Sequence, residues 1–135
     1  MDEADRKELF VMLTKFTINI APITKKNSSQ IIYNKSTGKP MIIPSKQYKQ
    51  YEKDARWFMP HIETIDYPVN VKAIFYMPTR RRVDLVNCLQ ALCDVMVKYG
   101  VIADDNSNII RSFDGSYVDY DKSRPRTEVY IWKIE

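Results

Sequence analysis

One stretch decides the fold: TRRRVDLVNCLQALCDVMVKYGVIADDNSNII, residues 79–110. Its apolar positions recur at three- and four-residue steps, which predicts an amphipathic helix from about Asp84 to about Lys98. Gly100 follows where a left-handed glycine commonly closes a helix, with apolar Val101 just beyond it. Arginines therefore lead into a helix start that carries a carboxylate, and a second acidic group comes after the helix.

The chain before this stretch carries two further helical patterns. A helix is expected from about Lys46 to Phe58, with Ser45 as its N-cap and an aromatic stripe that we assign to the core. Residues 5–13 suit a short helix, which would belong to an N-terminal extension over residues 1–14. The remaining residues, 15–135, are expected to form one domain.

Period-two alternation predicts the strands. They are expected at 16–20, 31–33, 41–43, 69–76, 109–113 and 129–132, with a polar loop at 115–125. The resulting order predicts an α+β fold in which two main helices pack against a mixed β-sheet.

Composition indicates an ordinary soluble globular domain. The chain has 135 residues, 44% of them apolar and 28% charged, with a net charge of +4. This mild basic bias is compatible with a polyanionic partner without identifying one. No apolar run approaches the length of a membrane span, and residues 1–14 are too charged for a signal peptide. We therefore expect a cytoplasmic protein with no membrane partner.

Both cysteines fall within the helix expected after Asp84. The five-residue spacing of Cys88 and Cys93 places the two thiols about 140° apart around the helix axis, so they cannot pair within it. We expect buried, reduced thiols. Because His61 is the only histidine, a Cys/His zinc site within one chain is excluded.

The acidic residues of the opening stretch allow two interpretations. A helix N-terminus stabilises a carboxylate such as Asp84 by roughly 0.3–1 kcal/mol, and residues 104–106 have the composition of a simple turn. However, Mg²⁺ is often held by one or two carboxylates plus substrate phosphate and water, and Asp84 with Asp105 would meet that minimum. The arginines at 80–82 suit bidentate phosphate binding, although they also suit a solvated basic turn.

The run RRVDLVNCLQALCD at 81–94, followed by a paired aspartate, resembles the RusA family of Holliday-junction resolvases. The family pattern is approximately R-x-D-L-D-N-x-x-K-A-x-x-D, with D-D some ten residues later. The matching positions are Arg81 or Arg82, Asp84, Leu85, Asn87, Ala91, Asp94, Asp104 and Asp105. Weaker matches are P-I-T-K-K-N at 22–27 and S-K-Q-Y at 45–48. The resemblance spans about Phe16 to Glu135 and is specific only at 80–110.

The resemblance implies a RusA-like fold, a homodimer, and paired nicking of four-way DNA junctions with Mg²⁺ held by three aspartates. Mn²⁺ is a possible substitute for Mg²⁺. Carried over to this chain, Asp84 is the first catalytic ligand and Asp105 the last, with Asp104 beside it. The DNA contacts that we expect are Arg80, Arg81, Arg82, Lys25, Lys26 and Asn27.

Two positions depart from the family pattern. Val86 stands where the family has its second aspartate, and Gln90 stands where it has a lysine. A valine cannot bind Mg²⁺. Either Asp104 or the amide oxygen of Asn87 completes the metal shell, or the site cuts slowly, or the protein binds junctions without cutting them. A basic interaction protein, with Asp84 only as a helix-start carboxylate, is the remaining alternative.

Overall fold

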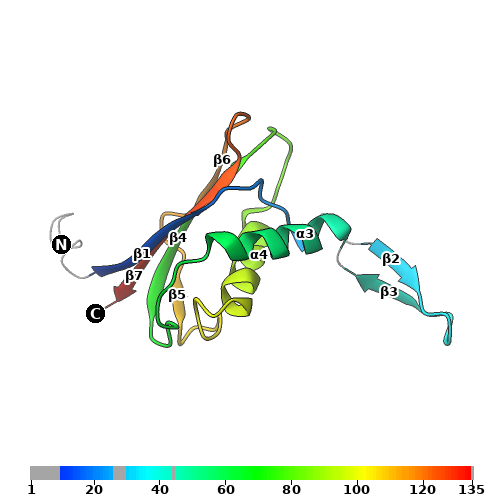
Figure 1. The fold of residues 1–135 in the computed structure, drawn as a ribbon, viewed down its shortest axis with the longest axis horizontal. Coiled ribbons are helices and arrows are strands. Elements are labelled where there is room, and N and C mark those ends of the chain that lie inside the picture. Colours follow the sequence, from blue (N-terminus) through cyan, green and yellow to red (C-terminus); the bar gives the residue numbers. More distant parts are fainter. Residues whose placement is uncertain (1–9, 26–29, 44, 135) are drawn as a thin grey trace.

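The computed structural model describes residues 10–25, 30–43 and 45–134, and it shows a mixed β-sheet with helices on one face (Figure 1). The elements are β1 (Phe10–Ile18), β2 (Gln30–Tyr33), β3 (Pro40–Ile43), α3 (Lys46–Ala55), η1 (Arg56–Phe58), β4 (Val69–Met77), α4 (Leu85–Lys98), β5 (Ile110–Ser112), β6 (Tyr117–Tyr120) and β7 (Arg126–Ile134). The expected α+β fold class is thereby confirmed.

Strand β4 organises the five-stranded sheet. β7 pairs with it antiparallel, and β1 pairs with the far edge of β7. On the other edge of β4, β5 pairs parallel near Val69 and β6 pairs parallel at residues 74–77. Because parallel strands need a crossover connection, α4 is the crossover that leads from β4 to β5. The stretch that follows α4 therefore returns to the start of β4.

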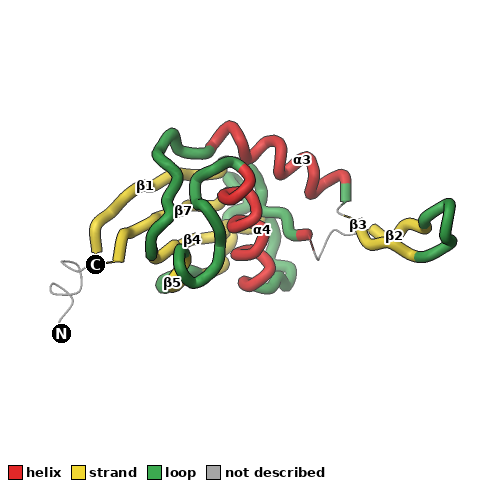
Figure 2. Tube along the Cα trace, turned by 90° about the horizontal axis from the view of Figure 1, so that it is seen from below, coloured by secondary structure: helices red, strands yellow, loops and turns green. Residues whose placement is uncertain are grey.

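The core lies between the sheet and the two helices. Val71 stands opposite Ile131, and Ala73 stands opposite Val129, and all four side chains are fully buried. They belong to one buried cluster with residues of α3 and α4, so both helices pack on this face of the sheet (Figure 2). In α3 the buried side chains are Tyr48, Tyr51 and Ala55, which confirms the core role of the aromatic stripe.

The ends of both helices follow from their capping residues. Ser45 Oγ accepts a hydrogen bond of 3.1 Å from the backbone N–H of Tyr48, which confirms Ser45 as the N-cap of α3. Gly100 closes α4 with a φ of 74°, in the left-handed region that favours glycine. Val101, just beyond it, donates its N–H to the Met96 carbonyl at 2.9 Å and is buried.

The Ser45 cap gives a stability prediction. Ser45→Ala removes a buried hydrogen bond at the start of α3 and is expected to lower the free energy of unfolding by about 1 kcal/mol. Urea denaturation of the wild type and the variant measures this difference. Ser107→Ala, at an exposed serine outside the helices, is the control and should leave the transition midpoint in place. Equal transition midpoints for all three proteins would show that the Ser45 cap does not contribute to stability.

Two expectations about secondary structure were wrong. Residues 10–13 were expected to be helical, but they belong to β1, which pairs with β7; residues 1–9 lie outside the described part. The domain therefore includes at least residues 10–14 of the supposed extension. The loop expected at 115–125 contains β6, a short strand that pairs with the end of β4. The expected β2–β3 hairpin is confirmed, and it projects away from the rest of the molecule (Figure 1).

No helix in the described ranges is both long enough and apolar enough to cross a membrane.

Candidate functional site

Asp84 occupies the N-cap position of α4 and is exposed to solvent. Its backbone carbonyl accepts from the N–H groups of Asn87 and Cys88, while its side chain makes no capping hydrogen bond. Instead, Asp84 Oδ2 accepts a long bond of 3.3 Å from Asn87 Nδ2. The carboxylate thus faces solvent at the N-terminus of α4.

Asn87 orients the Asp84 carboxylate through its amide nitrogen. The amide nitrogen of Asn87 faces Asp84. If Asn87 is to supply its amide oxygen to a metal beside Asp84, as expected, the amide group must rotate by about 180°. The two groups are nevertheless brought together on the first turn of α4, as the sequence pattern predicts.

The paired aspartates have different surroundings within their turn. Asp104 Oδ1 accepts from the backbone N–H of Asp105 at 2.7 Å, and Asp104 Oδ2 accepts from Asn106 Nδ2 at 3.2 Å. Both carboxylate oxygens of Asp104 therefore hold the turn together. Asp105 is exposed and is the better placed of the two to offer its carboxylate to a ligand.

The turn returns alongside α4 instead of continuing past its end. Ala103 donates its N–H to the Ile65 carbonyl at 2.9 Å, and the Ile109 carbonyl accepts from Val69 at the start of β4. The turn therefore returns toward β4, at the N-terminal end of that strand. Asp84 follows the opposite end of β4, so α4 and its flanking loops set the spacing between the two acidic positions.

The pKa values of the two cysteines in α4 are raised mainly by burial. Burial raises the pKa of Cys88 to about 11, with a smaller contribution from Asp84. Burial likewise raises the pKa of Cys93 to about 12, with smaller contributions from Asp105 and then Asp94. The thiols are separated by about 7.5 Å along the helix axis. Both thiols are buried and unpaired, as predicted.

The site offers Mg²⁺ carboxylate oxygens, which are a suitable type of ligand, but it offers only a few of them. Asp84 and Asp105 are exposed carboxylates, which are the hard ligands that Mg²⁺ prefers, and substrate phosphate and water commonly supply the rest. Within residues 10–25, 30–43 and 45–134, no group of three or more Asp, Glu, His or Cys side chains is placed to hold a metal ion. Asp84 and Asp105 thus offer the type of ligand that Mg²⁺ prefers, while the magnesium site and its three-aspartate set stay predictions.

Val86 lies where the family pattern has its second aspartate. It is 74% exposed on the first turn of α4, although valine is an apolar side chain. Because its side chain is mostly exposed, Val86 takes no part in the core. The difference from the family pattern at position 86 is therefore confined to the surface, and the fold around it does not depend on which residue stands there.

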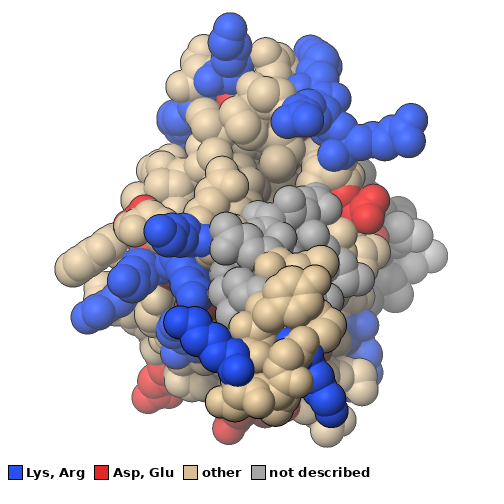
Figure 3. Space-filling model, turned by 90° about the vertical axis from the view of Figure 1, so that its right-hand side faces the viewer, with Lys and Arg blue, Asp and Glu red and all other residues tan. Residues whose placement is uncertain are grey.

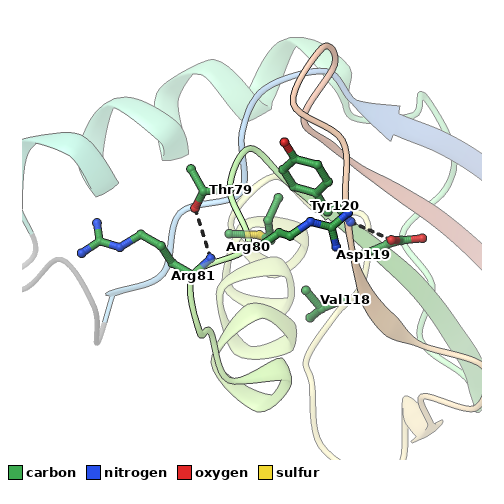
Figure 4. A pocket seen from close by; sticks show the side chains of 7 residues that line it. Thr79, Arg80, Arg81, Val118, Asp119 and Tyr120 are labelled. Carbon is green, nitrogen blue, oxygen red and sulfur yellow. Dashed lines mark hydrogen bonds between the residues drawn. The ribbon is translucent and has the colours of Figure 1, made fainter.

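Three arginines precede Asp84, and two of them line a shallow pocket of about 220 Å³ at the ends of β4 and β6 (Figure 4). The Arg80 guanidinium lies 4.3 Å from the centre of the Tyr120 ring. Arg81 and Arg82 are exposed. The pocket is lined by Met77, Thr79, Arg80, Arg81, Val118, Asp119 and Tyr120.

The expected contact residues in the loop after β1 are only partly described. Lys25 Nζ lies 3.3 Å from Asp94 Oδ2 and 5.5 Å from the centre of the Tyr48 ring. Lys25 also lines a small hollow with Asn87 and Gln90, so its charge lies beside the first turns of α4. Lys26 and Asn27 lie outside the described residues.

Basic side chains cover much of the face that is seen from the side of the hairpin, including the end that carries the arginines. Figure 3 views the molecule from the side of the hairpin and shows Lys and Arg side chains across its upper part, which corresponds to the β6 end in Figure 1. Lys and Arg side chains also extend over its middle and lower parts, so this face is basic as a whole. A polyanion would be attracted to it.

Comparison with known proteins places these features in a family. The family model described as Endodeoxyribonuclease RusA matches residues 19–132, which include β4, α4, the acidic turn and all of β6. The chain belongs to the RusA endodeoxyribonuclease family. This confirms the family that the run at 81–94 indicated.

A curated relative also matches part of the chain. The crossover junction endodeoxyribonuclease RusA of Aquifex aeolicus (strain VF5) is 46% identical over 44 residues. The match covers 33% of this chain and 35% of that relative, so it spans about a third of the relative's length.

Some residues around the RusA site could not be found by sequence reasoning. Asp119 and Tyr120 fall in the stretch that was expected to be a loop, and only the pairing of β6 with β4 brings them beside Arg80. The contact of Lys25 with Asp94 also joins residues that are far apart in the chain. The Tyr-Val-Asp-Tyr alternation of β6 was a weak signal for such a strand.

Proposed function

We propose that the protein is a structure-selective endodeoxyribonuclease that resolves four-way (Holliday) DNA junctions by paired, Mg²⁺-dependent phosphodiester hydrolysis. In this proposal it acts as a homodimer in the cytoplasm. The observation that carries the proposal is the RusA family match over residues 19–132, which includes the exposed Asp84 and Asp105.

In this proposal, one set of residues binds the metal and another set binds the DNA. Asp84 and Asp105 would bind Mg²⁺, and Asn87 would keep the Asp84 carboxylate oriented through its hydrogen bond. When bound, Mg²⁺ polarises the phosphate and lowers the pKa of an attacking water. Arg81 and Arg82 are exposed just upstream of Asp84 and would hold flanking phosphates through bidentate hydrogen bonds.

Dimer symmetry suits a junction substrate. A four-way junction presents strands in related pairs, and a two-fold dimer would bring one site to each of two opposed strands. Recognition would then rest on the shape of the junction and on phosphate contacts, because such contacts position a protein without reading sequence.

Val86 favours a second candidate function. With a 74% exposed valine at the family's aspartate position, the protein would be a junction-binding dimer that does not cut. This alternative keeps the same partner and the same basic face. It differs only in the chemical step, so a binding experiment supports the shared part and a cutting experiment separates the two.

Metal-free binding to a four-way junction, compared with a duplex of the same sequence, tests the shared part. Junction binding is expected to be preferred and to weaken steeply with salt, because phosphate contacts release counterions. Arg81→Ala and Arg82→Ala are each expected to reduce the slope of log K against log salt by about one. Lys53→Ala, at an exposed lysine in the last turn of α3, should leave the slope unchanged. Equal affinity for junction and duplex would reject both candidates.

A further inference from the structure

The face of the sheet turned away from the helices carries aromatic and basic side chains together. In β7, Val129 and Ile131 are buried in the core, while Tyr130 and Trp132 alternate with them and are half-buried on the opposite face. Helices α3 and α4 pack on the core side, so neither covers these two rings (Figure 1). We propose that this open sheet face, formed around Tyr130 and Trp132, binds single-stranded DNA by stacking its bases on the two rings.

The two rings of the open sheet face are nearly parallel. The ring centres of Tyr130 and Trp132 are 5.9 Å apart, and the ring planes differ by 12°. Nucleobases stack on such rings with little regard to sequence, because every base has a π-face. Bases within a duplex are already stacked on their neighbours, so an unpaired strand offers its bases far more readily. The ring pair therefore favours a single strand over a duplex.

Two lysines flank Tyr130 from the neighbouring strands. Lys15 in β1 and Lys72 in β4 both stand directly opposite Tyr130, so the three side chains share one face. The ammonium nitrogens of Lys15 and Lys72 lie 5.2 Å and 5.4 Å from the centre of the Tyr130 ring. Neither lysine forms an ion pair with an acidic side chain in the described part of the chain. Both charges are therefore available to the phosphates of a bound strand.

Glu128 is the acidic neighbour of Tyr130 on the same face, and its charge is already compensated. Its Oε2 accepts from Arg126 Nε at 3.0 Å, and its Oε1 accepts from the Tyr130 hydroxyl at 3.2 Å. The cations of Lys15 and Lys72 therefore remain uncompensated beside the rings. This charge favours a polyanion with flat bases over an apolar protein partner, which would have to bury two unpaired ammonium groups.

The side chains of the open sheet face are held in place by their neighbours. The Glu128 carboxylate holds the tip of the Tyr130 ring, and Trp132 packs beside that ring. A Cβ atom at Gly115 would lie 3.2 Å from Lys72 Cδ, so the glycine lets the lysine stem lie close against the turn before β6. Little ordering should therefore be needed on binding. Because Asp84 begins α4 on the other side of the sheet, the proposal goes beyond the proposed function and does not rest on it.

Tryptophan fluorescence without metal tests the stacking directly. The chain has two tryptophans, and Trp57 is 79% exposed in η1, outside the sheet. Trp57→Phe therefore leaves Trp132 as the only tryptophan and should bind a single strand as tightly as the wild type does. A single strand of about 15 nucleotides should quench the fluorescence of this variant, because a stacked base contacts the Trp132 ring. The blunt duplex of the same sequence should leave the fluorescence unchanged.

Affinity for the same strand, measured by anisotropy of an end label, separates the rings from the charges. Trp132→Ala should weaken binding by at least about tenfold, whereas Trp132→Phe keeps a ring and should lose less than about threefold. Lys15→Ala and Lys72→Ala should each reduce the slope of log K against log salt by about 0.7, the value for one phosphate contact on a single strand. Lys53→Ala, at an exposed lysine in α3, is the control and should leave the slope unchanged.

Three results would overturn the proposal: no binding of the single strand, binding without quenching of Trp132, or wild-type affinity in Trp132→Ala. Each of them would leave the proposed function in place, because preference for a four-way junction over duplex is measured separately. Loss of that junction preference in a wild type whose Trp132 is still quenched by the single strand would reject the proposed function and uphold the open sheet face.

Discussion

Replacing Asp84 or Asp105 by asparagine is expected to reduce junction cutting by on the order of 10³-fold. Each change removes a charged oxygen ligand from a site that has few protein ligands, and metal assistance supplies several kcal/mol of transition-state stabilisation, where about 4 kcal/mol corresponds to 10³-fold. Both side chains are exposed, so the fold should be retained. Single-turnover nicking of a labelled four-way junction in Mg²⁺ measures the effect.

The control for this pair is Asp104→Asn. Both carboxylate oxygens of Asp104 hold the turn together. Asp104→Asn should therefore lower the stability of the protein, and it should reduce junction cutting less than Asp105→Asn does. Junction binding by Asp84→Asn and Asp105→Asn should remain close to that of the wild type. Undiminished nicking by either variant would show that the chemistry takes place elsewhere on the protein.

Val86→Asp is expected to raise cutting by at least about tenfold, because it restores a carboxylate at the position where the family pattern has one. The side chain is 74% exposed, so no core packing is lost. An acidic residue in the first turn of a helix is also stabilised, typically by 0.3–1 kcal/mol. The rate of nicking at saturating enzyme, together with its Mg²⁺ dependence, measures the change.

Val97→Asp is the matched control for Val86→Asp. It places the same substitution at a 36% exposed valine in the last turn of α4, at the opposite end of the helix from Asp84. Cutting by this variant should not rise. If Val86→Asp leaves the rate and the Mg²⁺ requirement unchanged, the metal shell of this protein is complete without a carboxylate at position 86.

Most of the fold was predictable because its elements have strong periodic patterns. The apolar stripe of α4, the alternation in β4 and the Ser45 cap each led to the observed element. The failures occurred where pairing with a distant strand decides the structure. Residues 10–13 have apolar spacing that also suits a helix, and antiparallel pairing with β7 makes them a strand.

The family was predictable from the sequence, whereas the arrangement around the candidate site was not, and the site residues themselves stay predictions. The run at 81–94 indicated the family, and the comparison confirmed it. The positions of Asp119 and Tyr120 beside Arg80 depend on β6, a four-residue strand with an alternating exposed and half-buried pattern that gives little sequence signal. The different roles of Asp104 and Asp105 depend on hydrogen bonds within one turn, which composition alone does not distinguish.

Incubation of the wild-type protein with a synthetic four-way junction and Mg²⁺, resolved on a denaturing gel with each strand labelled in turn, tests the central claim most directly. The account predicts paired nicks at symmetry-related positions on two opposed strands, with none in chelator. Tight junction binding with no product in Mg²⁺ or Mn²⁺ would contradict the proposed activity and leave the non-cutting junction-binding protein.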